Sequence, residues 1–173
     1  MDFIGLSNNP YLDNVKEVMF YNNIFYNPNA SGALALVSSS GAAPKSGNAQ
    51  QTEVVLKQNT FYGVAGSNVL LVVNGAKSLT VQNNLFYAPA GQSAHTFVIK
   101  TIAAGVELEC QVGDNIAYGT PSFTITHSNS TFKIVDVEEN TIAKAASDPM
   151  KDATPSSGDF APTSEYSAYG AKR

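Results

Sequence analysis

Residues 17–27, EVMFYNNIFYN, combine four aromatic residues with three asparagines in a stretch that otherwise reads as a β-strand. Asparagine is depleted in strands, and a buried amide without hydrogen-bond partners costs about 1–3 kcal/mol. A strand that carries two adjacent asparagines must therefore provide hydrogen-bond partners for their side-chain amides or leave them exposed to water.

The same phrase returns four times further along the chain. Aligned on one asparagine, the later copies read EVVLKQNTFYG, LTVQNNLFYAP, CQVGDNIAYGT and VDVEENTIAKA. The steps between successive asparagines are 36, 25, 31 and 25 residues. A repeat at this period, with variable extra residues, is typical of one supersecondary unit that carries loop insertions. The aligned asparagines are Asn23, Asn59, Asn84, Asn115 and Asn140.

The residues around each asparagine fall into apolar and variable columns. The apolar columns lie five before, three before and two after the asparagine, at the spacing of one face of a strand. They hold Val18, Val54, Leu79, Cys110 and Val135; then Phe20, Leu56, Val81, Val112 and Val137; then Phe25, Phe61, Phe86, Ala117 and Ile142. This alternation predicts an apolar inward face and a variable outward face in every copy.

A further strand follows each of the first four copies, and no segment has a sustained helical period. These strands are expected at Ala33–Val37, Asn68–Asn74, His95–Thr101 and Ser122–Ser128. In an antiparallel sandwich, successive strands would have no reason to share a column-by-column sequence. In a parallel solenoid, equivalent strands lie on each other, so each column becomes a stacked ladder. The pattern therefore predicts an all-β parallel β-helix of about five coils.

In that fold the aligned asparagines have a structural role. Each would sit at a bend between two strands and point inward. Its amide could bond to the backbone of the turn and to the same amide one coil away, at the strand spacing of about 4.8 Å. The preceding column, which holds Asn22, is expected to face outward at the surface.

Composition excludes several classes of partner. Charged residues make up 14% of the 173 residues, the net charge is −4, and no run of Lys or Arg is present, so we expect no nucleic-acid partner. The single cysteine, Cys110, provides neither a disulfide nor a cysteine-based zinc site, and it falls in an inward column. No apolar run approaches the roughly 20 residues of a membrane span, and the N-terminus does not read as a signal peptide.

The repeated phrase and the C-terminal stretch together resemble secreted bacterial right-handed parallel β-helix proteins of the pectate-lyase-like superfamily. Residues 147–173 resemble the closing segment DPxFxDxxxGDFxPxxxSxAxxxG of such proteins. The matching residues are Asp148, Pro149, Asp152, Gly158, Asp159, Phe160, Pro162, Ser167, Ala168 and Gly170.

The resemblance implies coils over residues 1–146, incomplete at the N-terminal end, and an irregular C-terminal capping tail over residues 147–173 that packs over the last coil. It also implies a secreted or cell-surface protein that binds or processes polysaccharide along an exposed parallel sheet. An uncapped N-terminal coil would permit self-association.

Two groups of residues are candidates for a functional site. Outward positions offer stacking and hydrogen bonds to sugars, and we expect these at Tyr21, Lys57, Gln82 and Gln111. Stacked carboxylates in adjacent coils would suit Ca²⁺, a hard cation that takes oxygen ligands, and we expect these at Asp114, Asp136 and Glu139. Both groups could equally be solvated surface.

Other conspicuous side chains favour structural roles. The tyrosines that follow the inward phenylalanine column are expected to stack on one another and stabilise the solenoid, and they are Tyr26, Tyr62, Tyr87 and Tyr118. His95 and His127 lie in equivalent strands and are read as surface residues.

The sequence does not assign a catalytic centre. A polysaccharide lyase of this kind needs a base and a cation that neutralises the uronate carboxylate. Lys57 is the only basic residue in an outward column of the repeated strand, and Arg173 is the only arginine in the chain. Two hypotheses follow: a polysaccharide-binding or lyase module, and a structural or adhesive solenoid without specific sugar chemistry.

Overall fold

The computed structural model describes twelve stretches of the chain. They are residues 2–5, 17–26, 35–38, 52–63, 71–72, 76–88, 95–101, 109–119, 121–127, 133–134, 142–154 and 159–172. Within these stretches the protein is all-β, its strand ladders are parallel, and no helix is present. Of the expected ladder and metal residues, Asn140, Asp136 and Glu139 lie outside the described residues.

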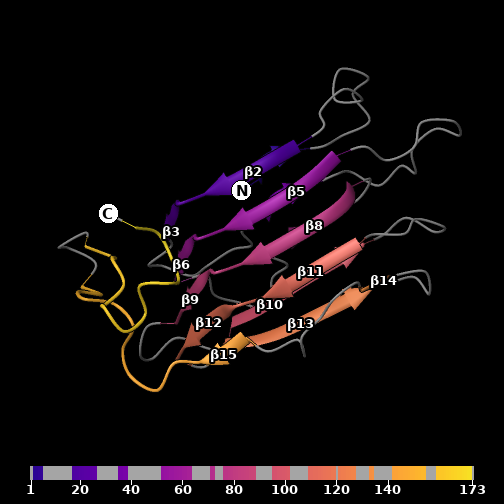
Figure 1. The fold of residues 1–173 in the computed structure, drawn as a ribbon. Helices are drawn as coiled ribbons and strands as arrows, with labels where there is room; N and C mark the ends of the chain where they lie inside the picture. The colour runs from indigo at the N-terminus through magenta and orange to yellow at the C-terminus, as the bar shows by residue number, and fades with distance from the viewer. Residues whose placement is uncertain are drawn as a thin grey trace, which may run out of the picture.

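Two five-stranded sheets are built from the repeated phrase. The first sheet has the order β14-β11-β8-β5-β2, formed by Lys133–Ile134, Glu109–Gly113, Ala76–Gln82, Thr52–Lys57 and Glu17–Tyr21. The second sheet has the order β15-β12-β9-β6-β3, formed by Ile142–Lys144, Asn115–Tyr118, Leu85–Tyr87, Thr60–Tyr62 and Ile24–Tyr26. Each copy of the phrase thus supplies one strand to each sheet, and the copies stack in chain order (Figure 1).

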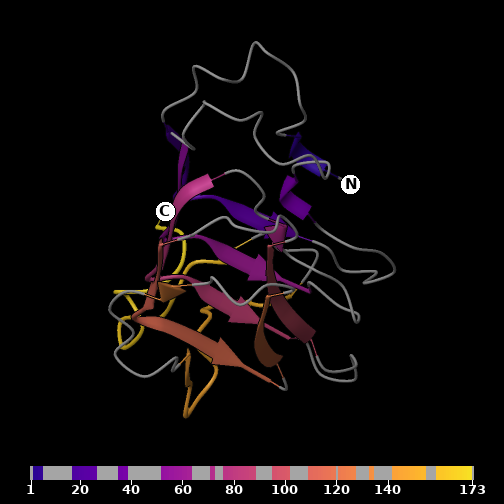
Figure 2. The ribbon, with the colours of Figure 1, turned by 90° about the vertical axis from the view of Figure 1, so that its right-hand side faces the viewer.

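The remaining strands continue each unit beyond the second sheet. The third sheet has the order β13-β10-β7, from Pro121–His127, His95–Thr101 and Leu71–Val72. β1 (Asp2–Gly5) pairs in parallel with β4 (Ala35–Ser38). Figure 2 shows the same order of units from another side, with the indigo N-terminal strands above the orange C-terminal ones. The strands expected over His95–Thr101 and Ser122–Ser128 are confirmed as β10 and β13.

The registers of the first four units follow the aligned columns. Val18 pairs with Val54, Val54 with Leu79, and Leu79 with Cys110. In the second sheet Phe25 pairs with Phe61, and Phe61 with Phe86. The inward side chains of these columns form the core, since Val54, Leu56, Leu79 and Val81 are all 0% exposed. Cross-strand contact between identical apolar positions explains why the columns repeat.

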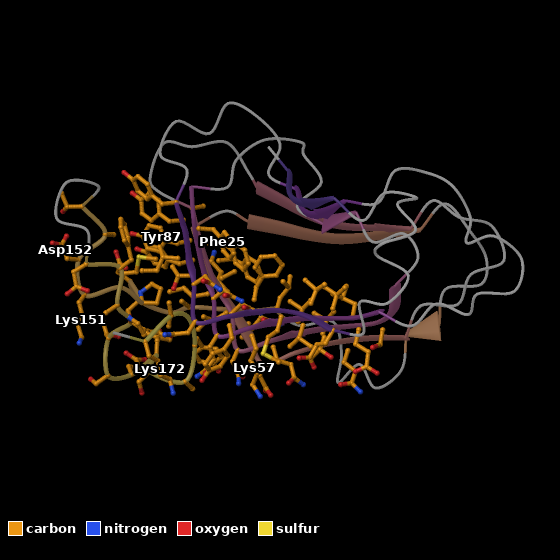
Figure 3. All side chains as sticks on the ribbon, turned by 90° about the horizontal axis from the view of Figure 1, so that it is seen from above. Phe25, Lys57, Tyr87, Lys151, Asp152 and Lys172 are labelled. Carbon is orange, nitrogen blue, oxygen red and sulfur yellow. The ribbon has the colours of Figure 1, made fainter. Side chains whose placement is uncertain are left out.

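The phenylalanine column is a continuous stack. The Phe25 and Phe61 rings lie 4.9 Å apart with an interplanar angle of 8°, and the Phe61 and Phe86 rings lie 5.0 Å apart at 6°. Each such aromatic pair contributes about 0.5–1.5 kcal/mol beyond the burial of its area. Figure 3 shows Phe25 on the interior side of the first sheet, opposite the side on which Lys57 lies.

The fifth unit does not follow the predicted register. The alignment placed Val135 beside Cys110 and Ile142 beside Ala117, and both placements are wrong. Cys110 pairs with Ile134, and Ala117 pairs with Lys144. Among the described strands, β14 and β15 are the last of their sheets, so no described strand beyond them fixes the register of this unit. The observed register exposes Lys144 and buries Ala145, which packs among the apolar residues beneath the C-terminal segment.

The C-terminal segment, residues 147–173, was expected to pack over the last coil. Its described parts, residues 147–154 and 159–172, lie instead along the outer face of the second sheet and reach back to the first unit (Figure 1). The outward residues of β3, β6, β9 and β12 are Ile, Leu and Tyr apart from Thr60, and burying these apolar side chains favours the contact with the C-terminal segment. The cluster between sheet and segment contains Tyr62, Leu85, Tyr87 and Ile116 from the sheet and Ala145, Met150, Phe160 and Tyr166 from the C-terminal residues.

Candidate functional site

Four asparagines form a directional hydrogen-bond ladder through the turns that join the first and second sheets. The side-chain Oδ1 of Asn59 accepts from the backbone N–H of Asn23 at 3.0 Å and from its Nδ2 at 3.2 Å. Asn84 Oδ1 accepts in the same way from Asn59, and Asn115 Oδ1 from Asn84. Every rung therefore points the same way, from each asparagine to the next one along the chain.

The amide nitrogens of the ladder also bind the backbone of neighbouring turns. Asn59 Nδ2 donates to Phe20 O at 2.8 Å, Asn84 Nδ2 to Leu56 O at 2.9 Å, and Asn115 Nδ2 to Val81 O at 2.8 Å. Asn59 and Asn84 are 0% exposed. Burial of these amides is tolerated because each one is satisfied on both its oxygen and its nitrogen.

The residue before each of the four described ladder asparagines was expected at the surface; Asn22 and Asp114 are exposed, as expected, whereas Asn83 is half-buried and Gln58 is buried. Asn22, Gln58, Asn83 and Asp114 have φ angles of 60°, 53°, 56° and 51°. This left-handed region is uncommon outside glycine, and Asn and Asp tolerate it best. Gln58 is also buried, at 8% exposure. The column therefore makes the turn, and that role accounts for an aspartate at position 114 without a metal.

The tyrosine column is confirmed as a stack. Ring centroids are 5.2 Å apart for Tyr26 and Tyr62, 5.2 Å for Tyr62 and Tyr87, and 5.1 Å for Tyr87 and Tyr118. The stack lies under the C-terminal segment: Tyr62 donates its hydroxyl to Ala153 O at 3.1 Å.

Tyr87 is the tyrosine of this stack whose ionisation is most affected. Its hydroxyl donates to Asp148 Oδ2 at 2.9 Å. Burial raises the pKa of Tyr87 well above its ordinary value, and the hydrogen bond and the nearby charge of Asp148 raise it further. Burial, with contributions from Tyr26 and Asp148, also raises the pKa of Tyr62. These neutral phenols serve the docking of the C-terminal segment.

The end of the C-terminal segment is anchored to the turn column. Gly170 N–H donates to Asn83 O at 2.8 Å, and Ala171 N–H donates to Thr60 Oγ1 at 2.9 Å. Lys172 N–H donates to Asn22 Oδ1, and Asn22 Nδ2 returns a bond to Lys172 O at 3.1 Å. Gly170 has a φ of 69°, and a Cβ there would lie 2.8 Å from Thr60 Oγ1, so the close approach requires glycine.

The outer face of the first sheet is the candidate functional surface, and it carries the predicted sugar-contacting residues. Tyr21, Lys57 and Gln82 pair in register on β2, β5 and β8, and Gly113 follows on β11. Gln111 does not join that row. It lies in the adjacent outward row, where it pairs with Thr80.

Exposure along this face is graded. Tyr21 and Met19, both on β2, are each 53% exposed, and Gln111 is also exposed. Lys57, Gln82 and Thr80 are half-buried. Figure 3 shows Lys57 on the outer side of the sheet, away from the interior and from Lys151 and Asp152 in the C-terminal segment. The face therefore offers one aromatic ring, one amine and two amides to a ligand.

An acidic row at the start of the same strands was missed. Glu17 pairs with Glu53, and the register continues through Ser78 and Glu109 to Lys133. The signal was available in the sequence, since glutamate stands six residues before the ladder asparagine in three of the first four units and Ser78 stands there in the third. Glu17 and Glu53 lie at the start of β2 and β5, whereas Lys57 lies at the end of β5.

The predicted calcium site is not assembled from described residues, because Asp136 and Glu139 lie outside them. Asp114 is exposed in the turn column. Within the described stretches, no group of three His, Cys, Asp or Glu residues is placed to hold a metal ion. The side chains of Cys110, His95 and His127 are not described, and only their strand registers are known.

In the part of the chain that the structure describes, no helix is long and apolar enough to cross a membrane.

No family model, no curated protein and no solved structure matches this chain.

Proposed function

We propose that the protein is a right-handed parallel β-helix that binds polysaccharide on the outer face of its first sheet, as a secreted or cell-surface module. The parallel sheets and the chain-ordered stack of units support the fold. Its handedness follows from the strong right-handed preference of parallel crossovers.

The observation that carries the binding proposal is the exposed ring of Tyr21 beside Lys57 and Gln82. An aromatic ring offers a flat apolar surface to the CH face of a sugar, and the amine and amide reach its hydroxyls. Strands of one sheet lie about 4.8 Å apart, close to the length of one pyranose ring, so successive strands would meet successive sugars. An extended chain running across the strands matches this row.

If the protein is also an enzyme, the reaction we propose is β-elimination on a uronic-acid polysaccharide bound to the same face. Lys57 would take the proton next to a uronate carboxylate while the bond to the leaving glycosidic oxygen breaks, and the reaction would also need a cation on that carboxylate, for which the described residues form no site. We propose binding as the primary activity and treat elimination as a reaction to be measured on the same substrates.

The experiment is affinity electrophoresis through gels that contain neutral or uronic-acid polysaccharides, together with ultraviolet detection of unsaturated products. Tyr21→Ala should weaken retardation by about 1 kcal/mol, or about fivefold in dissociation constant. Lys57→Ala should also weaken it, whereas Lys151→Ala, an exposed lysine of the C-terminal segment, is the matched control and should not.

The rival proposal is a structural or adhesive solenoid. Its support is that the ladder asparagines and the stacked tyrosines are all used in packing and hydrogen bonds. Absence of retardation by every polysaccharide, together with a trimeric or filamentous state in solution, would favour this rival and overturn the binding proposal.

A further inference from the structure

The end of the C-terminal segment lies across the turns that follow the strands of the first sheet. Residues 170, 171 and 172 each donate a backbone N–H to one of these turns or to the start of β6. The last of the three, Lys172, exchanges two hydrogen bonds with the side chain of Asn22, which directly follows Tyr21 of β2. The backbone of Lys172 is therefore fixed at the end of β2.

Asn22 also connects Lys172 to the row of residues that we propose to contact sugars. Its backbone N–H donates to Lys57 O at 3.2 Å, and Lys57 pairs in register with Tyr21. One residue thus binds the backbones of two lysines, one from β5 and one from the C-terminal segment. Figure 3 shows Lys57 and Lys172 on the same side of the molecule. Both lysines lie at the end of β2, where Tyr21 is 53% exposed.

The charge at this end of the strands differs from that of the chain as a whole. The net charge is −4, and Glu17 and Glu53 lie at the starts of β2 and β5. Glu53 precedes Lys57 by four residues, which is about 13 Å along a strand and exceeds the screening length of roughly 8 Å at physiological ionic strength. Lys172 is exposed, and within the described stretches neither it nor Lys57 forms an ion pair. The two ammonium groups can therefore bind an anionic group on a ligand.

We propose that Lys172 is a further binding residue of the outer face of the first sheet, and that with Lys57 it selects sugar chains that carry anionic groups. This inference rests on the proposed polysaccharide binding. The ring of Tyr21 stacks on a sugar whatever the charge of that sugar, whereas the ammonium groups discriminate by charge. The C-terminal segment then has two tasks, since it covers the second sheet and supplies a specificity residue to the first.

The test is affinity electrophoresis in gels that contain dextran, carboxymethyl-dextran or dextran sulfate. These polymers share one backbone and differ in charge, and mobilities are referred to a gel without polymer. The wild type should bind the charged dextrans more tightly than dextran. Lys172→Gln should lower that preference about threefold, the size expected for one exposed ionic contact. Lys151→Gln removes the same charge from an exposed position of the same segment, and it is the matched control that should keep the preference.

A variant of Asn22 tests whether the position of Lys172 matters as well as its charge. Asn22→Gly suits the φ of 60° at this turn and removes the side-chain bonds that hold Lys172. It should lower the preference for charged dextrans although both lysines are still present. In the wild type, about 1 M salt should abolish the preference, because the screening length falls to about 3 Å.

The outcomes separate this inference from the proposed function. If retardation depends on Tyr21 but Lys172→Gln and Lys151→Gln have equal effects, the role of Lys172 is overturned and polysaccharide binding stands. Equal retardation of the wild type by all three dextrans would also overturn the selection of anionic groups. If no polysaccharide of any charge retards the protein, the proposed function fails together with this inference.

Discussion

At the scale of single residues, the two asparagines of each turn have separate tasks. Asn23 and its equivalents use their side chains, because the amide joins one unit to the next. Asn22 and its equivalents use their backbone, because the bend requires positive φ. Asparagine suits both positions for unrelated physical reasons, which is why the pair NN appears in the repeat.

Asn84→Ala should destabilise the protein strongly. The substitution removes two accepted and two donated side-chain bonds, and it leaves the buried backbone N–H of Asn59 without its acceptor. We expect a loss of about 3 kcal/mol in the free energy of unfolding. Asn23→Ala is the matched control, and it should lose only about 1 kcal/mol because Asn23 is exposed. Urea unfolding measures both, and equal losses would contradict the ladder account.

Substitutions at Asp114 can show whether this residue is needed for the backbone conformation of the turn or for binding a metal ion. Asp114→Val should cost about 1–2 kcal/mol, because a β-branched residue is strained at a φ of 51°, whereas Asp114→Gly should change stability by no more than about 0.5 kcal/mol. Urea unfolding with and without Ca²⁺ measures both effects. If glycine costs as much as valine, and a Ca²⁺-dependent stabilisation disappears with it, the carboxylate is a metal ligand instead.

At the scale of elements, β6 and β9 of the second sheet are buried on both faces, whereas the outward Tyr26 of β3 is exposed. The inner face of this sheet carries the stacked phenylalanines, and its outer face carries leucine, isoleucine and tyrosine under the C-terminal segment. The first sheet has only its inner face covered by the core. The C-terminal segment is therefore part of the fold, and its removal would uncover an apolar sheet face.

The ionisation of Tyr87 determines how the contact between the C-terminal segment and the second sheet depends on pH. Its folded pKa is raised above the ordinary value of 10.0, so the folded state holds the phenol proton more tightly than the unfolded state does. The resulting stability is fully present below pH 10 and is lost as the pH rises above it. Tyr87→Phe should lose about 1–2 kcal/mol at neutral pH and show a smaller alkaline decline.

Thermal unfolding from pH 8 to 11 measures the effect. Because Tyr62 also has a raised pKa, the alkaline decline of the variant should be reduced and not abolished. A variant with the same decline as the wild type would show that Tyr87 ionisation does not control docking of the segment.

At the scale of the whole molecule, the repeat predicted the strands, their parallel pairing and the inward columns of the first four units. Apolar residues recur at the same positions in successive copies because equivalent strands stack on one another. The parallel pairing can therefore be predicted from the sequence. The fifth unit was misaligned, and the observed register is the one that buries Ala145 against the C-terminal segment.

The path of the C-terminal segment could not be read from its own residues. It depends on the outer face of the second sheet, where Leu85, Ile116 and the tyrosines become neighbours only after stacking. The rows of the candidate site, by contrast, could be read from the aligned columns. These columns place Tyr21, Lys57 and Gln82 in one row and Gln111 with Thr80 in another, and the observed register confirms both placements.

The central claim is that successive units stack in parallel and in register. Met19, Val55, Thr80 and Gln111 occupy one outward row on four neighbouring strands. Nitroxide labels can be placed pairwise on this row in a Cys110→Ala background, and dipolar electron paramagnetic resonance then gives the distances. From position 19, the backbone separations to positions 55, 80 and 111 should rise in equal steps of about 5 Å. Distances that do not increase in this order would contradict the stacked arrangement.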